Sequence, residues 1–254
     1  MASLIVWFTS FLLRLLILFR GSKVRAFFKY PYFYAYILSS CIGDVLVYAA
    51  WLARPTAYQK TYWGVQFVTL MIGCGLMLEI FKHVLAPYPG AERFAMAVAL
   101  VTFGAIFCFA LLYQFFAPNW SSEKGTSIEL ERNVRTVQAI FLFGIFAVIS
   151  YYQILVGRNL KGMISGYGLY VGTSLVVLAF RAYAGHPLEA ASNIIQPLSY
   201  DLSMLIWLVA LWSYHQNPVP DPAIHLEEDY EALAARTKRT LVAMRSHLTK
   251  AARP

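Results

Sequence analysis

Long apolar runs separated by short charged clusters dominate the pattern of this chain. Seven runs stand out, and each is close to the about 17–25 residues that a helix needs to cross a hydrocarbon core. Stretches such as Ala139 to Ile149 are apolar on every face, so they lack the alternation that is typical of membrane β-strands. The pattern predicts an all-α, polytopic membrane bundle of seven transmembrane helices, at residues 2–19, 32–51, 62–80, 94–116, 137–155, 163–180 and 198–214.

The first run carries Arg14 and ends in a basic cluster. A cleaved signal peptide has its positive charge before the apolar region, so the order found here predicts a retained helix. The run is also short. Two alternatives therefore stay open: either it crosses the membrane, or it lies in the interface, which leaves six spans and a cytoplasmic N-terminus.

The clusters between the runs are unequally basic on the two sides of the predicted bundle. Fourteen Lys and Arg residues lie in alternate loops and the tail on one side, and six lie in loops on the other. Lys and Arg concentrate on the cytoplasmic side of membrane proteins. We therefore expect a multi-pass protein of the inner (plasma) membrane, with its N-terminus outside and its C-terminus in the cytoplasm.

The composition agrees with this fold class and narrows the function. Hydrophobic residues make up 59% and charged residues 13% of the chain, against roughly 45–50% and 25% in soluble domains. The net charge of +8 is explained by the cytoplasmic loops and by attraction to anionic headgroups, so no nucleic-acid partner is expected. The three cysteines lie inside apolar runs without disulfide or metal spacing.

The composition changes after Trp212, where prolines form a stiff spacer that ends the last span. Residues 216–254 form a predicted cytoplasmic tail. Apolar residues three and four positions apart predict an amphipathic helix at about 225–250. Two interpretations stay open: the helix lies on the membrane, or it docks on a cytoplasmic protein or on a second copy of the chain.

Ionisable residues in the apolar runs are the first candidates for function, because a charge in lipid is costly. Asp44 lies about 20 Å from the cytoplasmic end of its helix, at 1.5 Å per residue. Other charged groups flank the outer ends of later runs. Either these groups converge on an outward polar pocket, or the later ones are interfacial and Asp44 bonds a neighbouring helix. The candidate pocket comprises Asp44, Asp201, Arg135, Arg181 and His186.

A second polar cluster is predicted on the cytoplasmic side. Glu79 and His83 are four residues apart on one helical face, which suits either a shared metal or capping at the interface. Capping is favoured because no third or fourth ligand is evident, so no metal or other cofactor is expected. Arg14 lies in the inner half of the first run, where it either reaches the headgroups or pairs with Glu79.

The sixth run and its approach contain two pairs of glycines four residues apart: Gly162 with Gly166, and Gly168 with Gly172. This spacing lets helix backbones approach closely, and packing within the bundle is favoured over packing between protomers. The same helix carries Tyr167 and Tyr170, which either line a cavity or pack as core aromatics.

Known catalytic motifs are absent or poorly matched. A retinal protein needs a lysine inside a late helix, and the nearest, Lys161, lies in a loop. Intramembrane aspartyl proteases pair two aspartates; Asp44 after Gly43 and Asp201 after Tyr200 give a thin match in reversed order. The chain has no Walker, HExxH, GxSxG or GxGxxG motif. A non-enzymatic role is therefore expected.

Three stretches in and beside the early runs carry a resemblance. They are Tyr30-Pro31-Tyr32-Phe33, Thr61-Tyr62-Trp63-Gly64, and the segment from Glu79-Ile80-Phe81-Lys82-His83 to Pro87-Tyr88-Pro89-Gly90. In them, and across most of its spans, the chain resembles a group of uncharacterised bacterial seven-helix membrane proteins. The resemblance implies their topology and a bacterial inner membrane, but no ligand or activity.

The leading hypothesis is a sensor or receptor-like protein, or a scaffold, with an outward polar pocket and a tail helix that contacts a cytoplasmic partner. The alternative is a small-solute or ion transporter, or a subunit of one, that uses Asp44. No inverted repeat or pair of broken helices is visible, which weakens the alternative. The expected partners are the lipid bilayer and, through the tail, a protein or a second copy.

Overall fold

The computed structural model describes residues 2–53, 55–116, 123–184, 189–215, 217–218 and 225–251. These residues form α-helices and one short 3-10 helix, with no β-strand among them, so the predicted all-α class is confirmed. The helices are α1 (Ala2–Lys23), η1 (Ala26–Phe28), α2 (Pro31–Ala53), α3 (Pro55–Leu85), α4 (Pro89–Phe116), α5 (Glu123–Tyr151), α6 (Arg158–Ala184), α7 (Glu189–Ala210) and α8 (Leu226–Ala251).

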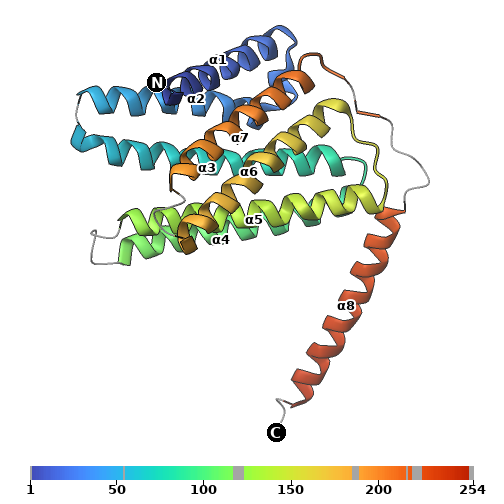
Figure 1. Cartoon of the computed structure of the whole chain (residues 1–254). Helices are drawn as coiled ribbons and strands as arrows, with labels where there is room; N and C mark the ends of the chain where they lie inside the picture. Colours follow the sequence, from blue (N-terminus) through green and yellow to red (C-terminus); the bar gives the residue numbers. More distant parts are fainter. Residues whose placement is uncertain are drawn as a thin grey trace.

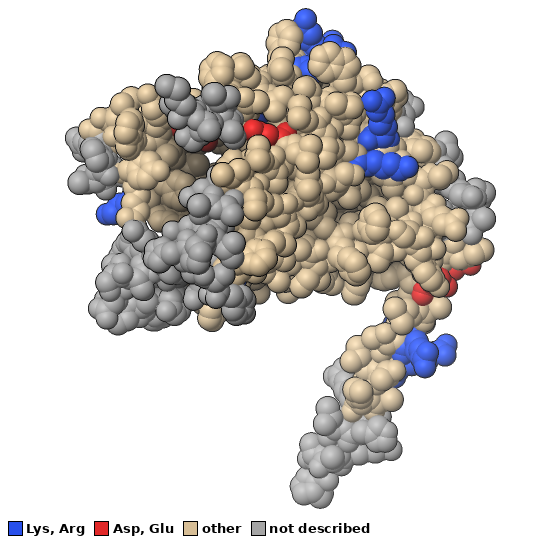
Figure 2. All heavy atoms as spheres, in the orientation of Figure 1, with Lys and Arg blue, Asp and Glu red and all other residues tan. Residues whose placement is uncertain are grey.

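Five helices are long and apolar enough to cross a membrane, which makes this a multi-pass membrane fold. Their spans are Pro31–Ala53, Tyr58–Leu85, Pro89–Ala110, Leu130–Tyr151 and Arg158–Phe180, and a shorter apolar helix covers Ile194–Ala210. The surface agrees: Figure 2 shows a broad uncharged band across the bundle, with most visible Lys and Arg atoms toward one end and on α8. The count of seven spans stays a prediction.

Helices α1 to α7 form one bundle, and α8 leaves it (Figure 1). Helix α3 contacts α2, α4, α5 and α6, while α1 packs against α2 and α7. Helices α6 and α7 pack on each other along one side of the bundle. We call the end from which α8 departs the tail end, and the other end the opposite end.

Two predicted boundaries are wrong. The fifth run was predicted at 137–155, but α5 begins at Glu123 and ends at Tyr151, so residues 123–132 are helical and not part of an outer loop. The seventh was predicted at 198–214, but α7 begins at Glu189 and contains Pro197. Both helices start with polar residues, which average hydropathy assigns to loops.

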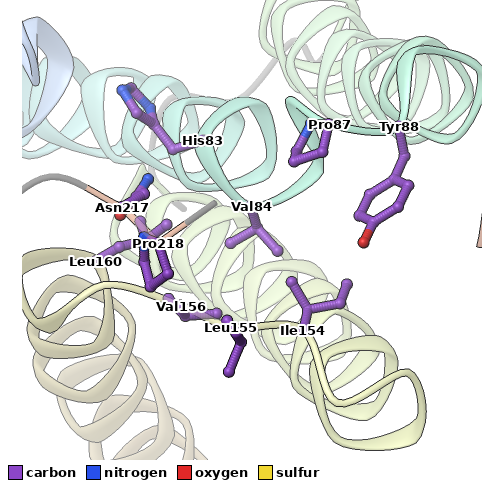
Figure 3. A pocket seen from close by; sticks show the side chains of 10 residues that line it. All are labelled: His83, Val84, Pro87, Tyr88, Ile154, Leu155, Val156, Leu160, Asn217 and Pro218. Carbon is purple, nitrogen blue, oxygen red and sulfur yellow. The ribbon is translucent and has the colours of Figure 1, made fainter. Parts of the chain in front are cut away.

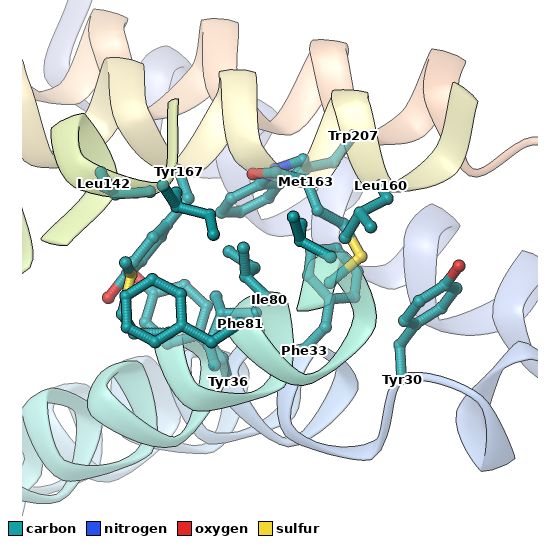
Figure 4. Close-up of a cluster of buried hydrophobic side chains, with 14 of the residues drawn as sticks. Tyr30, Phe33, Tyr36, Ile80, Phe81, Leu142, Leu160, Met163, Tyr167 and Trp207 are labelled. Carbon is teal, nitrogen blue, oxygen red and sulfur yellow. The ribbon is translucent and has the colours of Figure 1, made fainter. Parts of the chain in front are cut away.

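Aromatic side chains fill the core between α2, α6 and α7 (Figure 4). The ring of Trp207 meets Phe33 and Tyr36 edge to face, with centroids 5.1 and 6.2 Å away. Its indole N–H donates to the backbone oxygen of Met163 at 3.3 Å. A side chain on Gly166 would collide with the same indole. The small residues of α6 therefore allow the close approach of α7, as predicted for Gly162 and Gly166.

Candidate functional site

Helix α1 places a buried ion pair between itself and α2. The Arg14 side chain is 4% exposed, and its Nη2 lies 2.5 Å from Oδ2 of Asp44. Gly21 of α1 packs on the ring of Tyr34 of α2, so these two residues lie at the same height along the two antiparallel helices. From there Arg14 lies about 10 Å and Asp44 about 15 Å toward the opposite end. The arginine therefore reaches away from the nearer interface to meet its carboxylate.

The same face of α1 also contacts α7. Ser10 lies one turn from Arg14, and its hydroxyl donates a short hydrogen bond to Asp201. The Arg14 guanidinium lies 5.5 Å from the centre of the Tyr200 ring, and its Nε donates to the Ser10 carbonyl at 3.1 Å. One helical turn of α1 thus binds an aspartate on each neighbouring helix.

The contacts continue across the bundle. The Tyr200 ring lies 5.2 Å from the ring of Tyr170 on α6. Arg135 on α5 lies 4.6 Å from the centre of the Tyr170 ring and donates to its hydroxyl at 3.0 Å. We call Arg14, Tyr200, Tyr170 and Arg135 the arginine–tyrosine array. A cation lies on a tyrosine ring at each end of the array and the two rings contact each other in the middle, so the array joins α1, α7, α6 and α5.

Arg135 is an incompletely neutralised cation in the apolar interior. Its residue is 1% exposed, and its Nη1 donates to Gln138 at 3.2 Å. Its Nε lies 3.9 Å from the Glu131 carboxylate, which is beyond hydrogen-bond reach. Among the described residues, this Nε has no hydrogen-bond partner. Glu131 itself accepts from Gln66 of α3 at 2.9 Å. A buried charge with a spare donor is costly and is a candidate binding group for an anion.

Three members of the predicted outward pocket belong to this network: Asp44, Asp201 and Arg135. The prediction that Arg135 opens the fifth span is wrong, since it lies twelve residues inside α5. Asp201 likewise lies in the middle of α7 and not at its end. Arg181 belongs to α6, but its side chain lies outside the described part, and His186 lies outside the described residues altogether.

The prediction for Arg14 is also corrected. It neither reaches the headgroups nor pairs with Glu79, because Asp44 holds it inside the bundle. The guanidinium sits on a long side chain, and the preceding turn of α1 offers it a carbonyl as well as the nearby carboxylate. A paired and hydrogen-bonded arginine is more stable there than one that extends past several apolar residues.

Glu79 has the capping role that its spacing favoured. Its two oxygens accept the backbone N–H groups of Tyr32 and Phe33 at 3.1 and 2.8 Å, in the first turn of α2. That helix begins with Pro31, so Glu79 supplies the missing cap from another helix. His83 approaches the Glu79 carbonyl at 2.9 Å. His83 also lines a small cavity of about 30 Å³ at the tail end (Figure 3).

The first turn of α8 is docked on the tail end of the bundle. The two oxygens of Glu227 accept the N–H groups of Gly90 and Ala91 at 2.7 and 3.4 Å, which caps α4. The Tyr152 hydroxyl, one residue past α5, donates to Asp229 at 3.0 Å. Desolvation raises the pKa of the Tyr152 phenol, and the bond to Asp229 raises this pKa further, so the hydroxyl keeps its proton at neutral pH.

The second glycine pair has a different environment from the first. Gly162 approaches Ala210 of α7, whereas a side chain on Gly168 or Gly172 would meet nothing within 4 Å. These two glycines line an apolar groove of about 540 Å³ between α5 and α6, with Lys161 near one end. Packing within the bundle is therefore found for Gly162 and Gly166 and not for Gly168 and Gly172.

The partners of Asp44 and Asp201 do not indicate an aspartyl-protease dyad. Such a dyad needs two carboxyl groups that share one proton. Asp44 is bound to the guanidinium of Arg14, and Asp201 is bound to Ser10. Across the described residues, no three His, Cys, Asp or Glu side chains lie close enough together to hold a metal ion.

Sequence analysis missed Glu131, Gln138 and Tyr200 as parts of the network. Glu131 and Arg135 are four residues apart, a spacing that favours an ion pair on one helix. That signal was present, but residues 123–132 were assigned to a loop. The contact of Tyr200 with Arg14 has no local signal, because it depends on α1 packing beside α7.

No protein-family model, curated protein or solved structure matches this chain.

Proposed function

We propose that α1 to α7 all cross the membrane, with the N-terminus outside and α8 in the cytoplasm. Helix α1 has 22 residues, about 33 Å of helix, which is enough to span. Its packing against α2 and α7, with Arg14 inside, favours a span over an interfacial helix. The excess of Lys and Arg at the tail end sets the orientation.

Chemical labelling tests this topology. A cysteine placed at Ser122, with Cys108 changed to serine, should react with a membrane-impermeant maleimide added to intact cells. A reporter enzyme fused after Pro254 should be active only if it folds in the cytoplasm. Labelling of Ser122→Cys only after the membrane is broken would reverse the orientation.

We infer that the protein is a non-enzymatic membrane sensor whose input is the arginine–tyrosine array and whose output is α8. The observation that carries this proposal is the physical continuity between the two. Arg135 of the array and Tyr151 lie on one helix, α5, about 24 Å apart. The next residue, Tyr152, holds Asp229 in the first turn of α8. A shift of α5 at Arg135 therefore moves the docking point of α8.

The chemistry of the array indicates the class of stimulus. The Arg135 guanidinium keeps a donor without a partner among the described residues, and tyrosine rings surround it. An anionic group, such as a carboxylate, is the ligand that a guanidinium in an apolar site binds best.

The coupling is tested by measuring the distance between α8 and the bundle. Spin labels at Lys82→Cys and Arg239→Cys, in a variant without native cysteines, report this distance in lipid nanodiscs. We expect Arg135→Gln to change the distance distribution, because it removes the charge that joins α5 to the array. Tyr170→Phe, which removes one hydrogen bond to Arg135, should produce a smaller change in the same direction.

A matched control is adjacent on the helix. Within the described part of the chain, the Thr136 hydroxyl bonds only to the carbonyl of Arg132 on its own helix, so Thr136→Ala should leave the distribution as in the wild type. Glu227→Gln weakens the docking directly and shows that the method detects release of α8. If Glu227→Gln changes the distribution but Arg135→Gln does not, the array is not coupled to the tail and the sensor proposal fails.

The transporter alternative is supported by one observation. Asp44 is 30% exposed at its side chain although its helix is apolar, so it is accessible to a proton or a cation. In that case Asp44→Asn abolishes solute flux into proteoliposomes without lowering stability. Unchanged flux in this variant eliminates the alternative.

A further inference from the structure

Helix α8 carries an apolar stripe that continues far beyond its docking point. Leu226 is buried, and the ring of Tyr230 lies 6.1 Å from that of Phe94 on α4. Farther along, Leu233, Leu241 and Met244 are 64%, 60% and 57% exposed. Residues 226, 230, 233, 237, 241, 244 and 248 fall within about 80° of the helix circumference at 100° per residue. All but Thr237 are apolar.

The stripe faces the bundle at the docked end of α8, which in the proposed topology is the side of the bilayer. Leu226 and Tyr230 belong to it and point toward α4, so the later members of the stripe point the same way. Figure 1 shows α8 running across the direction of the spans and away from the bundle. A helix that crosses the spans at one end of the bundle extends along the membrane plane.

The charges of α8 change sign along its length. Four acidic residues lie in its first turns, where they suit the helix dipole and hold α4 and Tyr152. After Glu231 the chain has six Lys and Arg residues and no acidic residue. Lys238 and Arg245 border the stripe on one side and Arg236 on the other, about 80–100° from its centre. This arrangement lets the cations reach phosphates while the stripe enters the acyl region.

The spacing of the stripe does not keep one heptad register, because an extra step of four residues separates Thr237 from Leu241. The pairs 226 and 237, 230 and 241, 233 and 244, and 237 and 248 are each eleven residues apart. An eleven-residue period keeps the stripe straight along the helix, whereas a two-stranded left-handed coil needs seven. Two copies facing through this stripe would also bring their bordering cations together, which is repulsive.

We propose that α8 is an interfacial helix that binds anionic phospholipids of the leaflet at the tail end, with Leu233, Leu241 and Met244 inserted and the bordering cations on phosphates. The assignment of that leaflet to the cytoplasm rests on the proposed topology. Lipid binding itself does not, so the two are tested separately. The output of the proposed sensor is then a change in how firmly α8 is held on the membrane surface.

Two neighbouring residues make a sharp test. Leu241 lies in the stripe, while Val242 is equally exposed, at 62%, but about 140° from the centre of the stripe. A fluorophore sensitive to polarity is attached at Leu241→Cys or at Val242→Cys of the full-length protein without its native cysteines. Each nanodisc holds one protein, in either phosphatidylcholine or a mixture with phosphatidylglycerol.

We expect the probe at position 241 to shift to the blue in the anionic discs and to remain polar in phosphatidylcholine, while position 242 stays polar in both. Replacing Lys238 and Arg245 with glutamine should lower the ratio of bound to free helix roughly 30-fold, because each cation near an anionic surface strengthens binding about fivefold. The matched change of Arg239 and Lys250, on the far side of the helix, should lower it less, because their charges lie about a Debye length from the surface.

Two outcomes overturn the proposal. Equal spectra at positions 241 and 242 in both lipids mean that the stripe does not enter the bilayer. A blue shift at 241 that appears only when discs hold two proteins, in either lipid, assigns the stripe to a second copy. Neither outcome affects the distance measurements on Arg135, so failure here is distinguishable from failure of the sensor proposal.

Discussion

Asp44→Asn separates the energetic role of the ion pair from every other role of the carboxylate. The substitution keeps the shape of the side chain and leaves the Arg14 cation, 4% exposed, without a counter-charge. Breaking a fully buried pair costs about 3–5 kcal/mol. The pair is only partly buried, since the Asp44 side chain is 30% exposed, so we expect less than this full cost. The guanidinium also retains Tyr200, a contact worth about 0.5–1 kcal/mol. We expect a loss of about 2–3 kcal/mol in the free energy of unfolding.

The native cysteines provide the assay. Cys41 and Cys74 are buried and Cys108 is exposed, so a Cys108→Ser protein reacts with a fluorogenic thiol reagent only when it opens. Cys41 lies three residues from Asp44, whereas Cys74 lies on α3. Titration with denaturant in detergent, with each cysteine followed separately, distinguishes local opening around the pair from unfolding of the whole bundle.

Two further variants make the reasoning refutable. Asp201→Asn alters a carboxylate that binds a hydroxyl rather than a cation, and should cost only about 1 kcal/mol. The double variant Arg14→Leu with Asp44→Leu removes both charges, and should be as stable as the wild type or more so. If Asp44→Asn unfolds at the wild-type denaturant concentration, or if the double variant is as unstable as the single one, the pair does not stabilise the bundle as described.

Three other predictions follow from the packing and the docking of the tail. Gly166→Ala collides with the α7 indole and should cost about 1–3 kcal/mol in the same thiol assay, whereas Gly168→Ala, which faces open space, should be neutral. Glu227→Gln weakens the cap of α4 by on the order of 1 kcal/mol, and limited trypsin digestion should then cut α8 faster. The pKa of the Tyr152 phenol is raised. Below that pKa the phenol keeps its proton and its hydrogen bond to Asp229, and as the pH rises through that pKa the bond is lost. Digestion of α8 should therefore accelerate only at a pH above the range in which an ordinary tyrosine ionises, and Tyr152→Phe should remove this dependence.

The spans that were predicted well are those whose apolar residues cover the whole helix, since lipid or core surrounds them on every side. The run at 32–51, for example, lies within α2. The first half of α5 was missed although Glu131, Arg135 and Gln138 are buried polar residues, because average hydropathy cannot separate a buried polar face from a loop. Arg135 was therefore placed at the interface although it is almost fully buried.

The pairing of Arg14 with Asp44 could not be predicted from the sequence, for a geometric reason. Counting residues placed Asp44 in the outer half of its helix and Arg14 in the inner half of another. The levels differ by about 5 Å once Gly21 and Tyr34 are aligned, and the arginine side chain bridges that difference. Which helices are neighbours decides the partner, and α1 lies beside α2 and α7 rather than beside Glu79. By contrast, the cap by Glu79 was suggested by its spacing from His83 near the predicted cytoplasmic end of a helix.

The two caps borrowed from other helices differ in when they become available during synthesis. The cap of α2 comes from Glu79, on the very next helix, so this hairpin is completed as soon as it has been inserted. The cap of α4 comes from Glu227, which lies 137 residues after Gly90. The ribosome has made α5, α6 and α7 before it reaches that residue. Until then, the first turn of α4 is exposed to water, so a chain that stalls early differs from a finished one at a single, accessible helix end. Docking of α8 thus marks the moment at which the newly made bundle is complete.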